Sequence, residues 1–213
     1  KVSSEDARDF VETMLADTER LSDLIDNILE SSKSDPKSMQ LQFASVDIVS
    51  FLRETIEHHK RLFEEKQCLI QLKFDSQPKV SMDTRAMRMV FNNLIINALR
   101  YSSTDSSLAI HVKQDGKFCN IDFVDQGFGF DKKELKRVFK KFYRVQNQET
   151  QNIEGAGLGL YISRQIIKSH KGKINAFSEG RGKGTRFMVS MPLNVSPSTK
   201  SKEVSEEAGC SWR

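Results

Sequence analysis

Residues 87–101 read MRMVFNNLIINALRY, and this stretch decides the fold. Five apolar side chains share one face of a helix that turns about 100° per residue: Met87, Val90, Phe91, Leu94 and Ala98. Four polar or aromatic side chains form an adjacent face through their i, i+4 spacing: Asn93, Asn97, Arg100 and Tyr101. An asparagine inside a helix costs roughly half a kcal/mol relative to alanine, so two on one face need a reason. Alone, they fit plain surface amides as well as a polar shelf, on which amide oxygens would suit a hard cation such as magnesium.

Alternating and helical patterns surround this stretch and predict the rest of the fold. We expect strands at 41–46, 69–74, 108–114, 118–124, 173–178 and 185–191. We expect helices at 47–66, 84–101, 132–137 and 158–170, the first two capped by Asp47 and Asp83. Asp115-Gly116 marks a hairpin turn. The order predicts an α+β, two-layer α/β sandwich, a mixed sheet covered by helices on one face, preceded by a long N-terminal helix.

The two ends of the chain differ from this central part. A heptad of apolar residues, Ala7, Met14, Leu21 and Ile28, predicts a long helix over residues 5–33 that needs partner helices to bury its stripe. We therefore divide the chain into a helical segment at 1–35, a linker at 36–40, a globular domain at 41–193 and a disordered tail at 194–213, which is rich in Ser, Lys and Glu.

Composition excludes several classes of function. The chain has 213 residues with 33 basic and 29 acidic side chains, a net charge of +4 that is too small to argue for nucleic acid. Its apolar runs are far shorter than the ~20 residues that cross a bilayer. The polar first residues do not resemble a signal peptide. Three widely spaced cysteines predict neither a disulfide framework nor a metal site, and they fit a reducing compartment.

Three glycine-bearing motifs follow the asparagine helix. Residues 125–129, DQGFG, end an apolar strand, where a carboxylate could accept a hydrogen bond from an exocyclic amine while glycines let a flat ring approach. Residues 155–160, GAGLGL, open a helix whose positive end favours phosphate, although a polar loop instead of a strand precedes them, which excludes the dinucleotide-binding motif. Residues 182–185, GKGT, fit a flexible hairpin or a threonine hydroxyl near phosphate. Each motif is weak alone.

A fourth segment lies between these motifs. Residues 138–144 read VFKKFYR, and Phe139 and Phe142, three residues apart, are predicted to anchor the following polar loop in the core.

The order and spacing of these motifs over about 100 residues are specific. They resemble the catalytic, ATP-binding domain of bacterial two-component sensor histidine kinases, in the GHKL superfamily of kinases and ATPases. The resemblance covers residues 41–193. Residues 1–35 look like the second helix of the dimerisation and histidine-phosphotransfer hairpin of that family, through the stretch ERLSDLIDNILE at 19–30.

The resemblance implies a role for each residue of the asparagine helix. Asn97 matches the magnesium ligand, and Asn93 matches the residue that orders metal waters or phosphate. Arg100 matches a basic residue that faces phosphate, and Tyr101 an aromatic residue beside the adenine. Asn93 and Arg100 are therefore the candidate catalytic residues, with ATP and Mg²⁺ as cofactors.

The resemblance also assigns the motifs that follow. Asp125 matches the aspartate that binds the adenine amino group, flanked by Gly127 and Gly129. Phe139, Phe142 and Arg144 match the segment that leads into a lid over ATP, at about 144–156. Five residues match the hinge and phosphate-binding turn of that lid: Gly155, Gly157, Leu158, Gly159 and Leu160. Gly184 and Thr185 match the last glycine motif.

One feature departs from the family pattern. The family carries its phosphoacceptor histidine on the first hairpin helix, but none of His58, His59, His111 and His170 lies in such a motif. We therefore expect the acceptor on a helix upstream of this chain, with homodimerisation through the complete hairpin and a response-regulator receiver domain as partner. We expect no nucleic-acid partner, no membrane contact by this fragment and a cytoplasmic location, which is compatible with a parent anchored in the inner membrane.

Other classes of function remain open at this point. A GHKL-type ATPase would use a glutamate on the asparagine helix to activate water, but no Glu or Asp lies between Thr84 and Thr104. A nucleotide-free signalling scaffold would keep the fold without the intact motifs. A serine kinase of the anti-sigma type would lack the heptad at 7–28.

Overall fold

The computed structural model describes residues 41–145, 153 and 156–193. The predicted N-terminal helix, the linker and the C-terminal tail lie outside the described residues, as does most of the expected lid, including Gly155.

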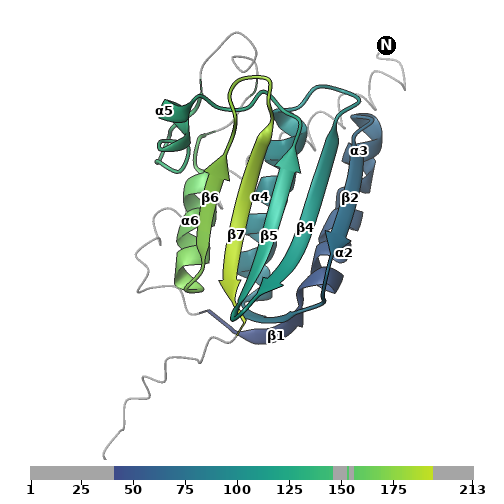
Figure 1. The fold of residues 1–213 in the computed structure, drawn as a ribbon, viewed down its shortest axis with the longest axis vertical. Helices are drawn as coiled ribbons and strands as arrows, with labels where there is room; N and C mark the ends of the chain where they lie inside the picture. The colour runs from purple at the N-terminus through teal and green to yellow at the C-terminus, as the bar shows by residue number, and fades with distance from the viewer. Residues whose placement is uncertain (1–40, 146–152, 154–155, 194–213) are drawn as a thin grey trace, which may run out of the picture.

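A five-stranded mixed sheet forms one layer of the domain (Figure 1). Its order is β2 (Leu69–Phe74), β4 (Ser107–Asp115), β5 (Phe118–Asp125), β7 (Thr185–Pro192) and β6 (Lys173–Phe177). The β2–β4 pair is parallel, and the other pairs are antiparallel. Two short strands, β1 (Ala44–Asp47) and β3 (Lys79–Met82), pair separately.

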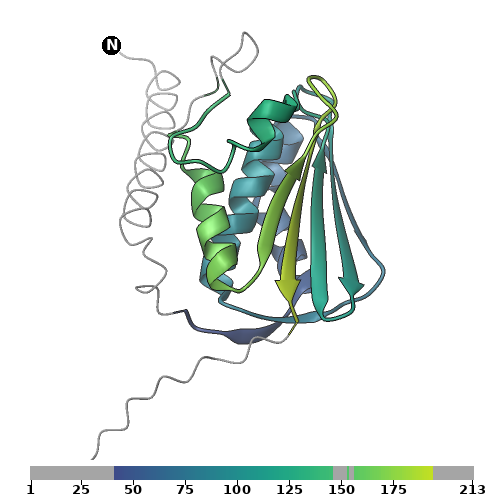
Figure 2. The same cartoon turned by 60° about the vertical axis from the view of Figure 1, so that its left-hand side comes forward.

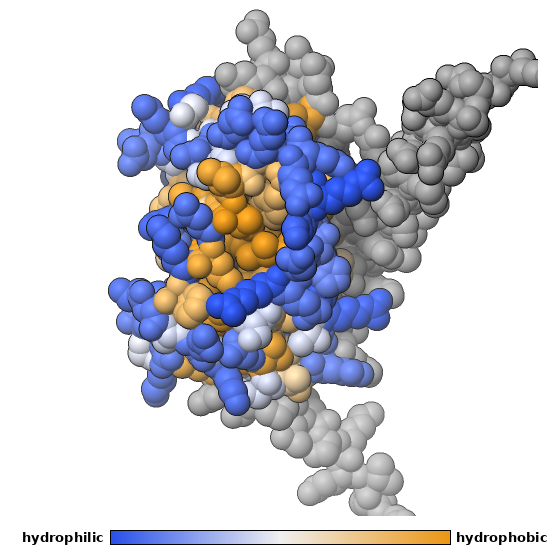
Figure 3. Space-filling model, turned by 90° about the vertical axis from the view of Figure 1, so that its right-hand side faces the viewer, coloured by the Kyte–Doolittle hydropathy of each residue, from blue (hydrophilic) through white to orange (hydrophobic). Residues whose placement is uncertain are grey.

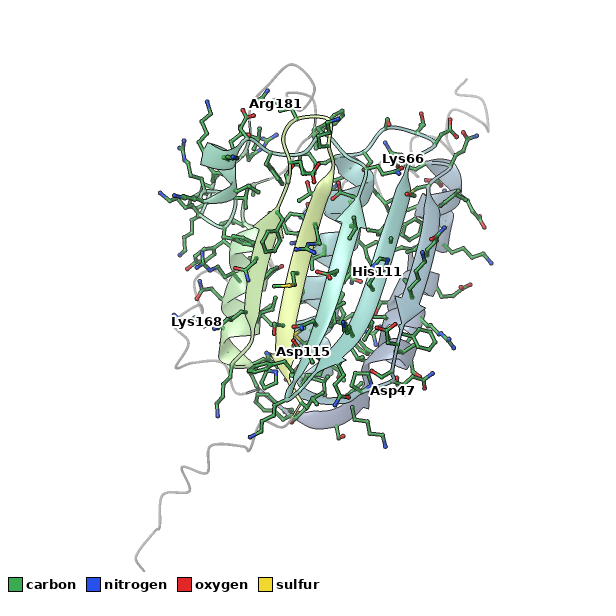
Figure 4. The ribbon with its side chains drawn as sticks, in the orientation of Figure 1. Asp47, Lys66, His111, Asp115, Lys168 and Arg181 are labelled. Atoms are coloured by element: carbon green, nitrogen blue, oxygen red, sulfur yellow. The ribbon has the colours of Figure 1, made fainter. Side chains whose placement is uncertain are left out.

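Helices cover one face of this sheet, as Figure 2 shows. They are α2 (Ile48–His58), α3 (Lys60–Glu65), α4 (Thr84–Arg100), α5 (Lys132–Leu135) and α6 (Gly159–Ser169). None of the helices that the structure describes covers the other face, and His111 of β4 lies exposed on it (Figure 4). The predicted fold class is therefore confirmed.

The apolar stripe of α4 is the centre of the core. Met87, Val90, Phe91 and Leu94 have no exposed surface, and Ala98 is 6% exposed. The Phe91 ring lies 5.7 Å from that of Phe123 on β5, so α4 packs directly on the middle of the sheet. Because the asparagine face lies on the same helix, burying the apolar stripe against the sheet also determines which way the asparagine side chains point.

Helix caps agree with the sequence, while three other features of the fold differ from what the sequence predicted. The Asp47 and Asp83 carboxylates accept hydrogen bonds from Ser50 N and Ala86 N, as predicted for N-caps. Strand β3 was not predicted. The helix expected at 47–66 is two helices, because the chain turns at His59, whose N–H donates to Ile56 O.

The third difference concerns the expected core anchors at 139 and 142. Phe139 is buried, but Phe142 is 70% exposed, so its assignment to the core is wrong. The backbone of Phe142 has a positive φ of 58°, which directs the side chain away from the turn that the spacing suggests.

Strand β2 ends the sheet on the right of Figure 1, and Figure 3 shows an apolar area on this side, bordered by polar side chains. Ile70, Leu72 and Phe74 of β2 pack on the core while partly exposed, and Leu69 is 70% exposed. Among the residues that the structure describes, no helix is long and apolar enough to cross a membrane.

Candidate nucleotide-binding site

Asparagine side chains join α4 to α6. Asn93 Nδ2 donates to Ser163 Oγ at 3.0 Å, and Asn97 Nδ2 donates to Asn93 Oδ1 at 3.4 Å. Within the described residues, the carbonyl oxygen of Asn97 accepts no hydrogen bond. Asn93 is therefore held in place by its neighbours, whereas Asn97 presents a free oxygen, the donor type that Mg²⁺ prefers.

The glycine turn before α6 lies directly against this asparagine pair. A Cβ atom on Gly159 would be 2.2 Å from Asn93 Oδ1, so any larger residue there would displace the Asn93 side chain. Gly157 has a φ of +70°, a conformation natural to glycine. No side chain caps the start of α6 at Leu158. The amides of its first turn are thus available to an anion, and the helix dipole favours negative charge there.

Asp125 closes the other end of the site, at the end of the central strand β5. It is 7% exposed, and its Oδ1 accepts hydrogen bonds from Gly127 N at 2.9 Å and Thr185 N at 3.0 Å. Burial raises the pKa of this carboxyl to about 6, although both backbone hydrogen bonds oppose the rise. Oδ2 has no partner within the described part of the chain. Asp125 can therefore accept one further hydrogen bond from a ligand.

Glycines bring the loops around Asp125 into backbone contact. Gly184 N donates to Gly127 O at 3.0 Å, and Gly182 N donates to Phe128 O at 2.7 Å. A Cβ on Gly127 would lie 2.4 Å from Tyr101 O, and a Cβ on Gly129 would lie 2.2 Å from Gly180 O. These glycines permit close packing of the two loops and the end of α4, a structural requirement that the sequence did not reveal.

The end of α4 lies beside the same loop. Phe128 N donates to Tyr101 O at 2.9 Å, while the Arg100 side chain in the last helical turn is exposed. Thr185 is buried and contributes its backbone N–H to Asp125. Asn93, Asn97, Tyr101 and Asp125 are thus brought to one region, along the C-terminal half of α4.

Comparison with known families agrees with this arrangement. Residues 82–195, more than half of the chain, match the family described as histidine kinase-, DNA gyrase B- and HSP90-like ATPase. The chain belongs to this ATPase family. Membership in an ATPase family agrees with the geometry of the site, in which the uncapped start of α6 lies against the asparagine side chains of α4.

Individual relatives match most of the chain. It is 32% identical over 191 residues to the sensor protein kinase WalK of Staphylococcus saprophyticus, which covers 89% of this chain and 31% of WalK. The chain thus spans about a third of the length of this curated relative.

Solved structures share the fold of this ATPase-family domain. Full-length ShkA in complex with AMPPNP has a TM-score of 0.75 at 24% identity, covering 90% of this chain and 40% of that one. The histidine kinase ThkA in complex with the response regulator protein TrrA has a TM-score of 0.70 at 21% identity, covering 90% and 53%.

The segment that enters the expected lid packs on the glycine turn of this ATPase-family site. A Cβ on Gly157 would lie 2.9 Å from the carbonyl carbon of Phe142, and Arg144 Nη2 donates to Ile153 O. Leu158 is 2% exposed and anchors the turn in the core. The described residues on either side of the expected lid segment therefore lie in contact with one another.

A buried histidine, whose distant partner the sequence did not indicate, lies at the far end of the same two helices. His170, at the end of α6, has no exposed surface. Its Nε2 accepts from Asp83 N at 3.0 Å, and its Nδ1 lies 2.8 Å from Ile166 O, so Nδ1 carries the proton. Asp83 Oδ2 in turn accepts from Gln42 N at 2.7 Å, and the Phe43 ring lies 5.1 Å from the imidazole.

We call Gln42, Phe43, Asp83 and His170 the entry joint, because the chain enters the domain there. Burial lowers the pKa of His170, against its bond to Ile166 O and the nearby charge of Asp83. The Ser-His-Lys-Gly context gave no signal for this contact, since Asp83 lies 87 residues away in sequence.

Proposed function

We propose that the domain binds Mg-ATP and acts as a protein-histidine kinase, transferring the γ-phosphoryl group to a histidine outside this chain. The observation that carries this proposal is the direct apposition of Asn93 and Gly159, which puts an amide face and an uncapped helix start at one place. Phosphoryl transfer depends mainly on positioning and on neutralising charge, which such a site supplies.

Each end of the nucleotide has a proposed set of partners. Asp125 Oδ2 accepts the adenine amino group, with Tyr101, Gly127 and Gly129 around the base. The first-turn amides of α6 and the turn at Gly157, Leu158, Gly159 and Leu160 hold the phosphates. Arg100 and Arg144 supply positive charge, and Asn93 orients the groups between them. Gly184 and Thr185 support Asp125 from β7.

Magnesium fits the donor set that the described residues offer. Among them, no cluster of three or more His, Cys, Asp or Glu side chains could hold a metal ion. The unpartnered oxygen of Asn97 is one hard donor, and Mg²⁺ completes its shell mainly with phosphate oxygens and waters. We propose that Asn97 holds Mg²⁺, which would supply charge neutralisation at the phosphates.

The acceptor and the partner lie outside the domain. His170 is buried, and His58 and His59 bond to Glu54 O and Asn92 Oδ1, so these three have structural contacts. We propose the acceptor histidine on the first helix of a dimeric hairpin, and a response-regulator receiver domain as the next phosphoryl acceptor. The complex of ThkA with a response regulator supports this partner class.

Nucleotide titrations with and without Mg²⁺ test the site assignment. We expect Asn97→Ala to abolish the gain in ATP affinity that Mg²⁺ gives to the wild type, and Asp125→Asn to weaken binding at least about tenfold, as expected for a lost charged hydrogen bond. Asn120→Ala and Asp122→Asn, on the open face of β5, are the matched controls. Wild-type affinity in both site variants would refute the assignment.

The kinase proposal is preferred to an autonomous ATPase. No acidic residue lies on α4, and Asn93 is committed to Ser163 and Asn97, so no group there can activate water. We expect the chain to bind ATP without steady hydrolysis. Sustained phosphate release that Asn97→Ala abolishes would favour the ATPase alternative.

A further inference from the structure

Strand β2 forms an edge of the sheet with one side left unpaired. It pairs with β4, and among the described residues no strand pairs with its other side. Figure 3 looks onto this edge and shows apolar side chains near its centre. Because an unpaired edge strand can pair with a strand of another molecule, native proteins usually protect such edges.

The hydrogen bonds to β4 show which backbone groups of β2 are unpaired. The N–H of Leu69 donates to Ser106 O at 2.9 Å, just before β4. Alternate residues of a strand direct their backbone groups to the same side, so Gln71 and Lys73 also face β4. The N–H and C=O groups of three residues, which we call the edge residues, therefore point to the free side: Ile70, Leu72 and Phe74.

The edge residues also carry the apolar surface of this side. Their side chains pack against the core but are only partly buried. Leu69 of β2 is 70% exposed, and Leu62 of α3, the helix that leads into β2, is 42% exposed. Unpaired backbone groups and exposed apolar side chains therefore occur together on one element, which suits contact with another strand.

Strand β2 lacks the features that protect a sheet edge. Its sequence, LIQLKF, contains no proline, and its register with β4 continues from Leu69 to Phe74 without a bulge. Its one charged residue, Lys73, lies on the uncovered face of the sheet and so does not block the edge. A short segment with high β-propensity and low charge favours pairing with a further strand.

The helices beside this edge do not favour a charged partner. Residues 53–66 of α2 and α3 carry four basic and four acidic side chains. Lys60 lies 3.7 Å from Glu57, and Arg61 lies 2.7 Å from Glu65, so charges of opposite sign are paired within these helices. Backbone pairing and apolar contact would therefore dominate recognition at this edge.

The sequence of β2 is complementary to itself in an antiparallel pair. With Leu72 opposite Leu72 of a second copy, Ile70 lies opposite Phe74. Lys73 then lies opposite the neutral Gln71. One neighbouring register would bring the two Lys73 side chains together, and the other would leave Phe74 without a partner in the strand. The register centred on Leu72 is therefore favoured.

We propose that β2 pairs antiparallel with β2 of a second copy of this chain, about a two-fold axis at Leu72. Because directly opposed residues point to the same face, the two sheets become one, with the helices of both copies on the same side. Strand β4 separates β2 from β5, so this pairing leaves Asp125 uncovered. The proposal does not depend on nucleotide binding.

Amide hydrogen exchange of the full chain, resolved by residue, tests this pairing at low and at high protein concentration. The amides of the edge residues should exchange at least about tenfold more slowly at high concentration. The amides of Gln71 and Lys73, which already face β4, should be protected at both. Protection of the edge residues at both concentrations would assign the edge to a segment of the same chain, and exposure at both would leave it unpaired. Either result would overturn the proposal.

The sign of the charge at Gln71 gives an independent test, because this side chain is exposed. Gln71→Lys places like charges opposite each other twice in the pair and should weaken self-association about fivefold. Gln71→Glu places opposite charges there and should strengthen self-association by a similar factor. Sedimentation equilibrium of the full chain measures both, with Asn175→Lys and Asn175→Glu on β6, the other edge, as matched controls.

A second change should reverse the effect of the first. Adding Lys73→Glu to Gln71→Lys again places opposite charges at both positions and should restore self-association. Self-association through the N-terminal segment would not depend on the charge at these positions. A shift in the same direction for Gln71→Lys and Gln71→Glu, an equal response of the Asn175 controls or no rescue would overturn the proposal. ATP affinity should not change in these variants, so this result is separable from that for the nucleotide site.

Discussion

At the scale of single residues, the burial of the Asp125 carboxyl lowers the stability of the domain at neutral pH. Its buried carboxyl has a pKa of about 6, whereas the unfolded chain has the ordinary value of 3.8. Between these values the folded state holds the proton more tightly, so this group contributes stability that is lost as the pH rises through 6. At neutral pH the charge therefore destabilises the domain and is available to a ligand.

Asp125→Asn should consequently stabilise the free domain while it weakens ATP binding. The asparagine oxygen can keep the bonds from Gly127 N and Thr185 N without a buried charge. We expect an increase in unfolding free energy of up to about 3 kcal/mol at pH 7.5, which shrinks as the pH falls from 6 and is lost below pH 4. Urea unfolding at both pH values measures it, and a loss of stability at pH 7.5 would contradict the burial cost.

ATP affinity should depend on pH through the same carboxyl. Below pH 6 the protonated group no longer accepts on both oxygens, so wild-type affinity should fall about tenfold from pH 7 to pH 5. Calorimetric titration of Asp125→Asn isolates the effect, because titration of the nucleotide phosphates affects both proteins. Parallel pH profiles for the two proteins would exclude Asp125 as the acceptor.

The contact between Gly159 and Asn93 can be tested by substitution and rescue. Gly159→Ala places a Cβ 2.2 Å from Asn93 Oδ1, and we expect a loss of about 1–3 kcal/mol in unfolding free energy. Adding Asn93→Ala should restore the stability but not ATP binding. Full ATP affinity in the rescued double variant would show that Asn93 has no role in the site.

Some residue positions could be read from the sequence and others could not. Asn93, Asn97 and Asp125 were identified as candidates from helical spacing and from a strand end, which are local signals. The outward direction of Phe142 depends on a positive φ that no local pattern indicates. Gly127 and Gly184 are joined by a backbone hydrogen bond although they lie 57 residues apart in the sequence. No local pattern could indicate this contact.

At the scale of elements, the entry joint makes the packing of α4 against α6 sensitive to acid. Burial lowers the pKa of His170 below its usual 6.5, so the unfolded chain takes up the proton first as the pH falls. The stability that the neutral imidazole provides is present above pH 6.5 and is lost as the pH decreases through the folded pKa.

The unfolding free energy of wild type should therefore fall relative to that of His170→Gln between pH 7 and pH 5. Glutamine offers one donor and one acceptor but does not titrate in this range. Subtracting the variant also removes the opposite contribution of Asp125. Chemical denaturation across the pH range measures the difference, with His111→Gln on the open face as the control. A constant difference between wild type and His170→Gln would show that the imidazole is not titrating.

Elements with strong local signals were predicted, and those that depend on distant contacts were not. Helix α4 has an aspartate cap and a complete apolar stripe, and the β4–β5 hairpin has Asp115-Gly116. Strand β3 has four residues and exists through its pairing with β1, 35 residues earlier. The amphipathic pattern at 47–66 continues across His59, so it did not indicate the break.

At the scale of the whole molecule, a nucleotide bound at the proposed site would contact α4, α6 and β5 and so would connect the two layers of the domain. Ligand that binds the folded state alone adds about 2.7 kcal/mol at 100 times its Kd. For a domain of about 150 residues, this corresponds to a rise in Tm of roughly 5–10 °C.

Saturating Mg-ATP should produce this thermal shift in wild type and a clearly smaller one in Asn97→Ala. Differential scanning fluorimetry with ATP, with and without chelator, measures both. Lack of any shift in the wild type would favour the nucleotide-free scaffold over the kinase.

The entry joint has a mechanical consequence for the domain. It joins the N-terminus of α4 to the C-terminus of α6. The candidate ligand residues lie toward the opposite end of each helix. Tilting a rod about 25 Å long by five degrees moves its tip by about 2 Å, more than a phosphate contact tolerates. A small tilt of α4 at the entry joint would therefore displace the candidate ligand residues by more than such a contact allows.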